Sequence, residues 1–430
     1  MNETEESKQP KMTNEEWNAY LAGVFGKLGI PLEPTCGVAH GIRIDYCYGV
    51  RIKIPATLGP RRFRVILFDM QNHLKVFDDI LNAGDYFVSR RRYFIAYGIQ
   101  ISDADTGEKI CQHIYCAKKR PVVIDMPVPT MGDCIAWFSY CEAFRKKHDC
   151  ELYVCMPEHV RKLFEDEYPE IHFISRNDKN SIYPYAHYTI GIFPEGKDDA
   201  DCPVDYRRTA LHHYGAYMLG MSPDECGEPP RVEIPKKRTI KEPYVCIATL
   251  ASGMCKEWIN PTGWMTVVDF LKKAGYRVID IDKSLTQGDG IHWTSIPREA
   301  EDFTGDLPLK QRAELIGHAD FFIGLGSGLS WLAWCCKVPV VLISGFSLPE
   351  SEFHTPYRVM NPNVCHGCYS DTRYVFKNHE HDWCPRHKGT SRHFECTRGI
   401  TPELVIDTIK RIPEFQRHAE SVKTKGEKEK

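Results

Sequence analysis

The sequence predicts an α/β protein built from two similar halves, each a parallel sheet wound by helices. Between residues 121 and 219, and again between 244 and 343, short apolar runs alternate with stretches of helical length. Strands that alternate with helices form parallel sheets through right-handed crossovers. A linker rich in Pro, Lys and Arg, residues 229–241, separates the two series. Two such halves place a ligand cleft between them, at the carboxyl ends of the strands.

The expected elements follow the chain in order. In the first half we predict strands at 122–126, 152–155, 171–174 and 188–193, with helices at 133–147, 158–168 and 206–219. In the second half we predict strands at 244–249, 277–282, 321–324 and 338–343, with helices at 262–274, 308–318 and 329–336.

The segment before the first half is β-like. Runs at 50–54, 63–68 and 93–101 alternate apolar and polar residues, and turn signals at 58–60, 82–84 and 103–107 separate them. A small barrel or sandwich fits this pattern. The polar ends of the chain, residues 1–20 and 419–430, are expected to be disordered.

The domain boundaries follow from these changes of pattern. We expect a β-rich domain at 21–118, a first Rossmann-like domain at 119–235 and a second at 236–360. A cysteine-containing segment at 361–398 and a helix at 399–418 complete the chain before its tail.

Composition excludes several classes of protein. The 430 residues are 42% hydrophobic and 26% charged, which is ordinary for a globular chain, and the net charge of −3 offers no field for nucleic acid or an anionic membrane. The acidic N-terminus lacks the pattern of a signal peptide, and no apolar stretch approaches the roughly 20 residues of a membrane helix. A cytoplasmic location is expected.

Most of the 18 cysteines stand singly in apolar runs, where they are expected to be core residues. Four near the C-terminus are spaced C-x2-C-x15-C-x11-C, in a segment with too few aliphatic residues to bury a core of its own. This spacing predicts a structural four-cysteine metal site, and by itself it favours zinc over iron. The predicted ligands are Cys365, Cys368, Cys384 and Cys396.

Asp133 is the first candidate for chemistry. It ends the loop Pro129-Thr-Met-Gly-Asp133, between a predicted strand and a predicted helix, and therefore faces the expected cleft. A carboxylate at such a point can accept a proton from a hydroxyl group. The alternative is a helix cap, because Asp also satisfies free amides at a helix start.

Two further loops face the same cleft. Lys256 ends Ser252-Gly-Met-Cys-Lys256, after the first strand of the second half, where a diphosphate would attract a compact cation; a solvated loop lysine is the alternative. Gly324-Leu-Gly-Ser-Gly-Leu-Ser330 opens a helix, so its amides can approach a phosphate. The G-x-G-x-G spacing, with no acid after the next strand, argues against NAD. Three D-x-D triplets, at 103–105, 199–201 and 280–282, are interpreted as turns or strand ends.

These motifs resemble a known family. Pro129-Thr-Met-Gly-Asp133 resembles the acceptor-side loop of ADP-heptose heptosyltransferases, and Gly326-Ser-Gly-Leu-Ser-Trp-Leu-Ala333 with Ser344-Gly-Phe-Ser347 resembles their donor-phosphate motif. The lipopolysaccharide enzymes usually carry Asp where this chain has Gly326, so no acidic role is transferred to that position. The segments 364–371 and 383–389 and the leading β-rich domain resemble more narrowly the bacterial autotransporter heptosyltransferases, over residues 30–415.

The resemblance implies a GT-B fold with two Rossmann-like domains, and inverting transfer of heptose from ADP-glycero-manno-heptose without a D-x-D metal. The acceptors would be serine hydroxyls of an autotransporter adhesin passenger, modified in the cytoplasm. By resemblance the four cysteines hold one structural iron (Fe³⁺) per chain, with zinc as the alternative, and the chains form a large ring, a dodecamer.

Residue by residue, the resemblance makes Asp133 the catalytic base and Lys256 the residue that neutralises the leaving group. It also assigns the donor phosphates to backbone amides at Ser327, Gly328 and Leu329, and the adenine side to Thr304 and Gly305. Two alternatives stay open: a lipopolysaccharide-type enzyme with a glycolipid acceptor, and a non-catalytic metal-finger assembly protein with a degenerate transferase fold.

Overall fold

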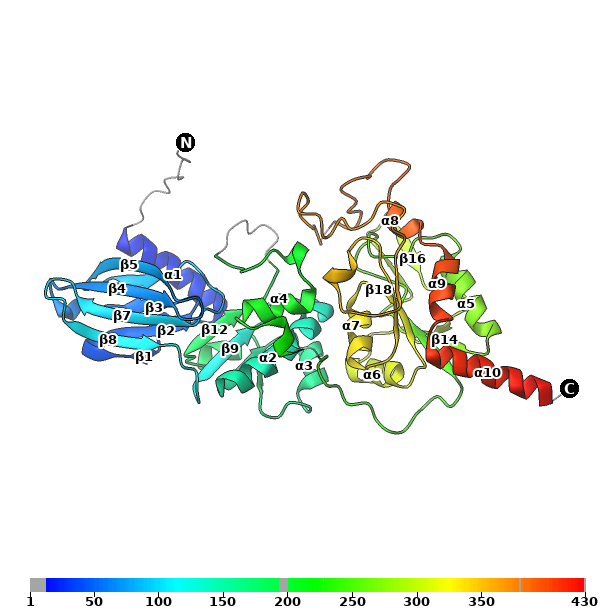
Figure 1. Ribbon diagram of the computed structural model, residues 1–430, viewed down its shortest axis with the longest axis horizontal. Coiled ribbons are helices and arrows are strands. Elements are labelled where there is room, and N and C mark those ends of the chain that lie inside the picture. The colour runs from blue at the N-terminus through cyan, green and yellow to red at the C-terminus, as the bar shows by residue number, and fades with distance from the viewer. Residues whose placement is uncertain (1–12, 193–199, 227, 379, 429–430) are drawn as a thin grey trace.

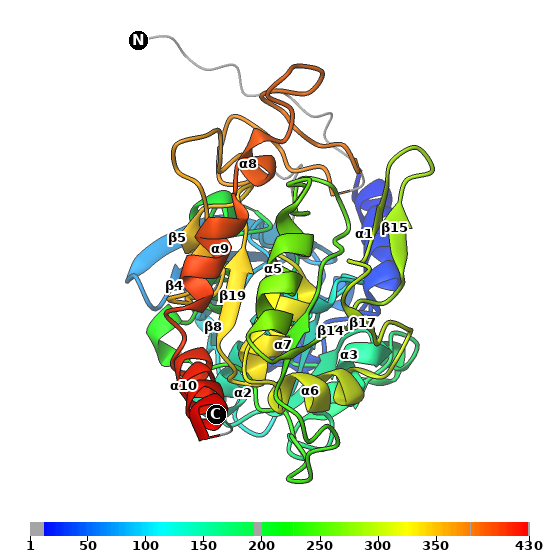
Figure 2. The ribbon, with the colours of Figure 1, turned by 90° about the vertical axis from the view of Figure 1, so that its right-hand side faces the viewer.

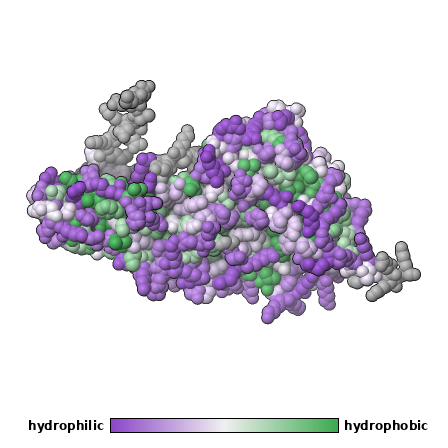
Figure 3. All heavy atoms as spheres, viewed as in Figure 1, coloured by the Kyte–Doolittle hydropathy of each residue, from purple (hydrophilic) through white to green (hydrophobic). Residues whose placement is uncertain are grey.

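The computed structural model describes residues 13–192, 200–226, 228–378 and 380–428. The molecule is elongated, with an antiparallel β layer at one end, the first α/β half in the middle and the second half at the other end (Figure 1). Polar side chains dominate the face in Figure 3, with apolar ones scattered among them. Within the described part of the chain, no helix has the length and apolar character that crossing a membrane requires.

The first half is the predicted parallel sheet with its helices. Strands β9 (Pro121–Asp125), β10 (Glu151–Cys155), β11 (His172–Ile174) and β12 (Ala186–Thr189) pair in the order β11-β10-β9-β12, all parallel. Helices α2 (Met131–His148), α3 (Glu158–Phe164) and α4 (Leu211–Met218) accompany them. Since α2 follows β9 directly, its first turn lies at the carboxyl edge of the sheet.

The β-rich segment does not form the barrel considered from the sequence. Strands β4 (Arg62–Asp69), β5 (Leu74–Asn82), β7 (Tyr97–Asp103) and β8 (Lys109–Ile114) form an open antiparallel sheet in the order β5-β4-β7-β8. Strands β1 (Cys36–Gly37), β2 (Arg43–Cys47), β3 (Arg51–Lys53) and β6 (Tyr86–Val88) instead extend the parallel sheet, because β2 pairs with β12.

The burial of β2 explains this arrangement. Its last four residues are all buried, so both of its faces are covered, as in an interior strand of an α/β sheet. One of the four is Asp45, which forms a buried ion pair with Arg51 on β3. A hydrophobic alternation alone does not reveal a strand of this kind, because its charge is paired inside the fold.

The second half repeats the parallel arrangement. Its sheet has the order β17-β14-β13-β18-β19-β20. The strands are β13 (Tyr244–Ile247), β14 (Arg277–Asp280), β17 (Glu301–Asp302), β18 (Phe322–Leu325), β19 (Val340–Ile343) and β20 (Arg358–Val359). The helices are α5 (Gly263–Lys273), α6 (Leu309–Gly317), α7 (Gly328–Cys335), α8 (Glu395–Arg398), α9 (Pro402–Ile409) and α10 (Pro413–Lys428).

Two apolar cores cover the two faces of this sheet. Tyr244 and Cys246 belong to the core that continues into the first half, whereas Val245 and Ile247 belong to the core under α5 and α9. Successive side chains of β13 point to opposite faces of the sheet, so alternate residues belong to the core that continues into the first half. Figure 2 shows α5 and α9 together on the outer side of the sheet, where they contact each other. A separate hairpin, β15 (Thr286–Gly288) with β16 (Trp293–Ser295), projects beside the sheet.

Both predicted tails are partly helical, which corrects the expectation of disorder at 1–20 and 419–430. Helix α1 (Asn14–Leu28) begins at a capping box between Thr13 and Glu16 and buries Leu21 and Phe25. Helix α10 continues through 419–428, anchored near its start by buried Phe415. Residues 1–12 and 429–430 lie outside the described part of the chain.

Candidate functional site

A cavity of about 350 Å³ lies where the two halves meet. Its walls come from the first turns of α2 and α7, the loops after β13, β14 and β19, and the cysteine-containing segment. The residues that line it include Thr130, Gly132, Asp133, Lys256, Asp282, Gly326, Ser327, Gly328, Leu329, Glu352, Tyr369 and Phe376. The structure thus brings together five of the seven residues predicted for the cleft, namely Asp133, Lys256, Ser327, Gly328 and Leu329.

Asp133 lies in the first turn of α2 but is not its cap. The cap is Thr130, and the hydroxyl group of Thr130 donates a hydrogen bond to the Asp133 carboxylate. Burial raises the pKa of Asp133, while this hydrogen bond and the positive charge of Lys256 lower it. The carboxylate is therefore a stronger proton acceptor than an exposed aspartate, and it faces the cavity.

Lys256 is a half-buried cation on the opposite wall. Its Nζ lies 3.4 Å from the Ser252 hydroxyl and above the rings of Phe346 and Phe376, at 5.9 and 5.4 Å from their centroids. Among the described residues, no carboxylate lies within ion-pair distance of it. The two rings hold the ammonium in place while its charge remains available to an anion in the cavity.

Two glycines allow the starts of α2 and α7 to meet. A Cβ on Gly132 would lie 3.0 Å from Trp331 and 3.4 Å from the Cα of Gly328. A Cβ on Gly328 would lie 2.6 Å from Met131. Because the first amides of a helix have no acceptor within the helix and carry partial positive charge, two adjoining helix starts favour an anion between them.

Thr304 and Gly305 do not line this cavity. Both the amide and the hydroxyl of Thr304 donate to Asp302, and the Gly305 amide donates to the carbonyl of Asp282 at 3.2 Å. Arg312 donates to the carbonyls of Gly305 and Asp282, at 2.7 and 3.0 Å. Asp282 lines the cavity and accepts the hydrogen bond from the Gly305 amide. The loop of Thr304 and Gly305 therefore lies directly behind the cavity wall.

Glu352 was not predicted from the sequence, and its carboxylate occupies the space beside Gly326. A Cβ at Gly326 would collide with Glu352 and would lie 3.3 Å from the Ser344 hydroxyl. Glu352 forms an ion pair with Arg358, which also donates to the Ser347 carbonyl at 3.1 Å. The carboxylate of Glu352 therefore lies beside Gly326, at a position where the chain itself has no side chain. No local motif marks Glu352, because it comes from a later loop.

A second missed feature is the carboxylate pair at the end of β14. Asp280 and Asp282 were interpreted as a strand end, which they are, but both are buried and Asp282 lines the cavity. Asp282 accepts the amides of Thr249 and Leu250, at 2.6 and 3.0 Å. Burial, with the charge of Asp282 as the next cause, raises the pKa of Asp280 to about 8. The pair fixes the start of the loop that carries Lys256.

The cysteine-containing segment forms part of the cavity wall. Tyr369 and Phe376 line the cavity, and the Tyr369 amide donates to the Phe346 carbonyl at 2.9 Å. Burial raises the pKa of Tyr369, and the nearby charges of Asp133 and Glu352 raise it further. The sequence spacing indicated a metal site here but gave no sign that the segment reaches the cavity between the two halves.

The four predicted metal ligands lie in one neighbourhood. Cys368, Cys384 and Cys396 are buried and Cys365 is half-buried, with the Arg386 guanidinium donating to the Cys365 sulfur at 3.7 Å. Burial raises the pKa of Cys396, and the charges of the other three cysteines and of Cys255 raise it further. The donor set suits a tetrahedral thiolate site. In the described part of the chain, however, no three of these sulfurs lie within 4.8 Å of one another.

Comparison with known proteins is consistent with this geometry. Residues 219–379 match glycosyltransferase family 9 (heptosyltransferase). The chain is 43% identical to the autotransporter heptosyltransferase Aah of Escherichia coli over 388 residues, 90% of this chain and 97% of Aah. It is 36% identical to the inactive autotransporter heptosyltransferase BimC of Burkholderia thailandensis, over 88% of each chain.

The structural comparison extends over the same length. The crystal structure of the iron-containing dodecameric glycosyltransferase TibC from enterotoxigenic E. coli matches with a TM-score of 0.84 and 41% identity, over 89% of this chain and 98% of TibC. TibC in complex with ADP-D-beta-D-heptose matches equally, with a TM-score of 0.84 and 40% identity, over 90% and 99% of the two chains. The α/β fold is therefore that of a GT-B glycosyltransferase. This chain belongs to the autotransporter heptosyltransferases, a group of glycosyltransferases of family 9.

Proposed function

We propose that this protein transfers heptose from ADP-glycero-manno-heptose to serine hydroxyls of an autotransporter adhesin passenger, in the cytoplasm. The observation that carries the proposal is the shared cavity, in which Asp133 faces Lys256 and the start of α7. The complex of TibC with ADP-heptose, a close structural relative, supports the donor. The names of Aah and TibC support a protein acceptor over a glycolipid.

The proposed chemistry is a direct displacement with inversion. Asp133 accepts the serine proton while the serine oxygen forms a bond to the anomeric carbon and the bond from that carbon to the diphosphate oxygen breaks. Positioned base catalysis of this kind contributes about 10²–10⁴-fold. Lys256 and the amides of Ser327, Gly328 and Leu329 neutralise the charge that develops on ADP.

Two further assignments belong to the donor. Glu352 is proposed to accept hydrogen bonds from heptose hydroxyls, because its carboxylate lines the cavity and its charge is already balanced by Arg358. Thr304 and Gly305 are proposed to face the adenine, with the nucleoside extending from the cavity past Asp282 to their loop.

The metal and the assembly also come from the relatives. We propose that Cys365, Cys368, Cys384 and Cys396 hold one structural iron, since TibC is described as iron-containing and four thiolates suit iron or zinc. We propose a dodecamer for the same reason. Elemental analysis and native mass spectrometry measure both directly.

A second candidate is a non-catalytic assembly protein, and the observation that favours it is BimC. BimC is described as inactive although it aligns over 88% of this chain. The two candidates differ in turnover, because an inactive homologue would release no ADP from ADP-heptose with any adhesin fragment.

The proposal is tested with purified protein, ADP-heptose and an adhesin passenger fragment. Wild type should add heptose to serine, seen as a mass increment, and Asp133→Asn should lower kcat by about 10²–10⁴-fold with donor affinity kept. Lys256→Ala should mainly weaken donor binding. Asp407→Asn and Lys410→Ala, at an exposed ion pair at the C-terminal end of α9, are matched controls. Retained turnover in folded Asp133→Asn would remove Asp133 from the base role.

A further inference from the structure

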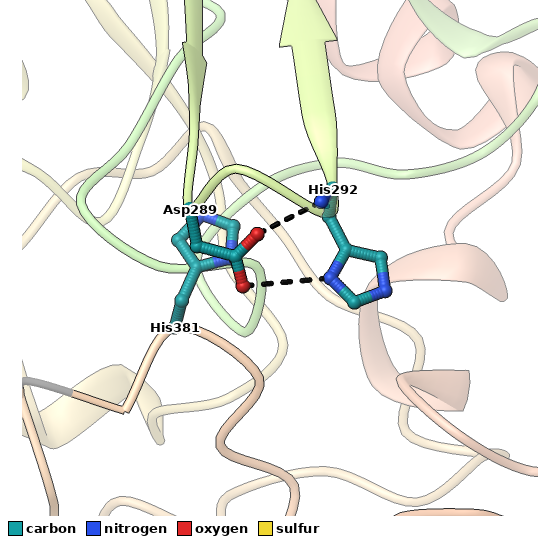
Figure 4. Close-up of side chains that lie close together, drawn as sticks. All are labelled: Asp289, His292 and His381. Carbon is teal, nitrogen blue, oxygen red and sulfur yellow. Dashed lines mark hydrogen bonds and ion pairs between the residues drawn. The ribbon is translucent and has the colours of Figure 1, made fainter.

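Three side chains outside the cavity converge at the tip of the β15–β16 hairpin. Asp289 and His292 come from the turn between the two strands, and His381 comes from the cysteine-containing segment (Figure 4). One ligand atom of each lies within 4.8 Å of the other two, the only such group of three among the residues that the structure describes. None of the three lines the donor cavity.

The turn orients the Asp289 carboxylate. Oδ1 accepts the amides of Ile291 and His292, at 2.9 and 2.8 Å, which leaves Oδ2 directed at the imidazoles. These amides are the main cause of an Asp289 pKa well below its ordinary value. The two amides therefore fix the orientation of the carboxylate before any ligand arrives.

The separations match a metal coordination sphere. Oδ2 of Asp289 lies 3.5 Å from Nδ1 of His292 and 3.6 Å from Nδ1 of His381. Ligands held at about 2.0–2.1 Å from a tetrahedral cation stand about 3.3–3.4 Å apart. The two observed contacts are too long for hydrogen bonds and close to that edge length, so a small contraction would place the three ligand atoms around one cation.

His381 gives independent support. Its side chain is 14% exposed, yet neither ring nitrogen is accessible or has a hydrogen-bond partner. Buried polar groups without partners are rare and call for an explanation, and a bound ion is one. Glu257 lies close enough to His381 for the two charges to interact, is 1% exposed, and has one carboxylate oxygen without a partner.

We propose that Asp289, His292 and His381 bind one divalent transition-metal cation of the Zn²⁺ class, in addition to any metal at the four cysteines. Two imidazoles and one carboxylate are the donors that zinc and its neighbours select, whereas calcium and magnesium take oxygen ligands. The 47% exposed side chain of His292 leaves a way in for the ion and space for a water ligand.

The site would fasten three segments together. The His381 carbonyl accepts the amide of Met254 at 3.0 Å, and Thr294 on β16 donates to Glu257 at 2.6 Å. Met254 and Glu257 flank Lys256 in sequence. A cation that joins the hairpin to His381 would therefore also tether the loop that carries Lys256.

Cobalt titration of the purified full-length protein tests the proposal. Co²⁺ at a histidine–carboxylate site gives weak visible d–d bands, whereas Co²⁺ at thiolates adds intense near-ultraviolet charge-transfer bands, so the two sites are distinguished in one spectrum. Wild type should bind one equivalent with visible bands alone, displaced by Zn²⁺. Asp289→Asn, which keeps the turn acceptor but not the charge, and His292→Ala should abolish this binding.

The controls make each outcome decisive. His354→Ala removes an exposed histidine elsewhere and should bind Co²⁺ as wild type does. His292 and Asp289 are on the surface turn, so their variants should fold, which circular dichroism checks. The proposal is overturned if wild type shows only thiolate bands, or if visible bands without thiolate charge transfer persist in Asp289→Asn and His292→Ala.

Discussion

At the scale of single residues, burial raises the pKa of carboxyl groups in this protein, and one or two neighbouring groups then modify that shift. Burial raises the pKa of Asp133, whereas the hydrogen bond from Thr130 and the charge of Lys256 lower it. Glu352 is neutralised by Arg358. Asp280 has no cation partner among the ion pairs of the described residues, and its pKa rises to about 8. Asp133 and Asp280 therefore differ in protonation behaviour because their neighbours differ.

Thr130→Val should shift the acid limb of kcat/KM to higher pH. The valine keeps the size of the side chain but donates no hydrogen bond to Asp133, so the ionised base loses one source of stabilisation. Turnover of ADP-heptose measured across the acid range, with Thr390→Val as control, gives the shift. An acid limb at the wild-type position would show that Asp133 does not control it.

Asp280 should make the protein less stable as pH rises. Between about pH 4, where an unfolded aspartate ionises, and its folded pKa of about 8, the folded state keeps a proton that the unfolded chain has lost. The free energy of unfolding therefore falls with rising pH, by up to about 1.4 kcal/mol per pH unit for one proton.

Asp280→Asn should flatten this dependence. Urea unfolding at several pH values and one fixed protein concentration measures it, because oligomers unfold in a concentration-dependent way. Asp407→Asn, an exposed aspartate, is the control. If Asp280→Asn keeps the wild-type slope, the buried pair is not its source.

At the scale of elements, the contact between helices α2 and α7 matters most for the proposed function, because the starts of both helices line the cavity. Each helix begins at the end of a sheet strand, and each exposes free amides to the same cavity. Small residues at both starts let the helices approach until only van der Waals distance separates them. The anion-binding character of the site therefore belongs to the pair of helices and depends on their spacing.

Gly132→Ala should open this contact. The added methyl group would lie 3.0 Å from Trp331 and 3.4 Å from the Gly328 backbone, and such overpacking costs about 1–3 kcal/mol. We expect lower stability and a higher KM for ADP-heptose. Gly23→Ala in α1, where nothing lies within 4 Å, should instead stabilise the helix by about 0.5–1 kcal/mol. A Gly132→Ala variant with unchanged KM would show that the spacing is not critical.

At the scale of the whole molecule, the C-terminal segment connects the four predicted metal ligands to the wall of the cavity. The same stretch supplies the four predicted ligands and two walls of the cavity, Tyr369 and Phe376. Its polar framework includes Asp371, which pairs with both Arg373 and Arg386. The segment has few aliphatic residues, but Trp383 and Phe394 are buried in a small apolar cluster, so its position depends on this cluster together with these ties.

Cys384→Ser should lose the metal and loosen the cavity wall. We expect the iron content to fall from one per chain to near zero, the thermal midpoint to drop, and the KM for ADP-heptose to rise more than kcat falls. Cys116→Ser, at an exposed cysteine, is the control. Full metal content in Cys384→Ser would exclude this residue as a ligand.

The sequence determined the local parts of this protein. Alternating strands and helices predicted both sheets, and the loops at their strand ends supplied Asp133, Lys256 and Ser327–Leu329, because parallel strands end at one edge. Spacing also marked the four cysteines. These features depend on short-range periodicity and on a topology rule that leaves few choices.

The tertiary structure decided everything that joins distant segments. It placed β2 inside the parallel sheet, brought Glu352 beside Gly326 and set Asp282 and Tyr369 in the cavity wall. It also brought His381 to the hairpin turn. None of these contacts has a period or a fixed spacing along the chain, because each is chosen by packing between elements far apart in sequence.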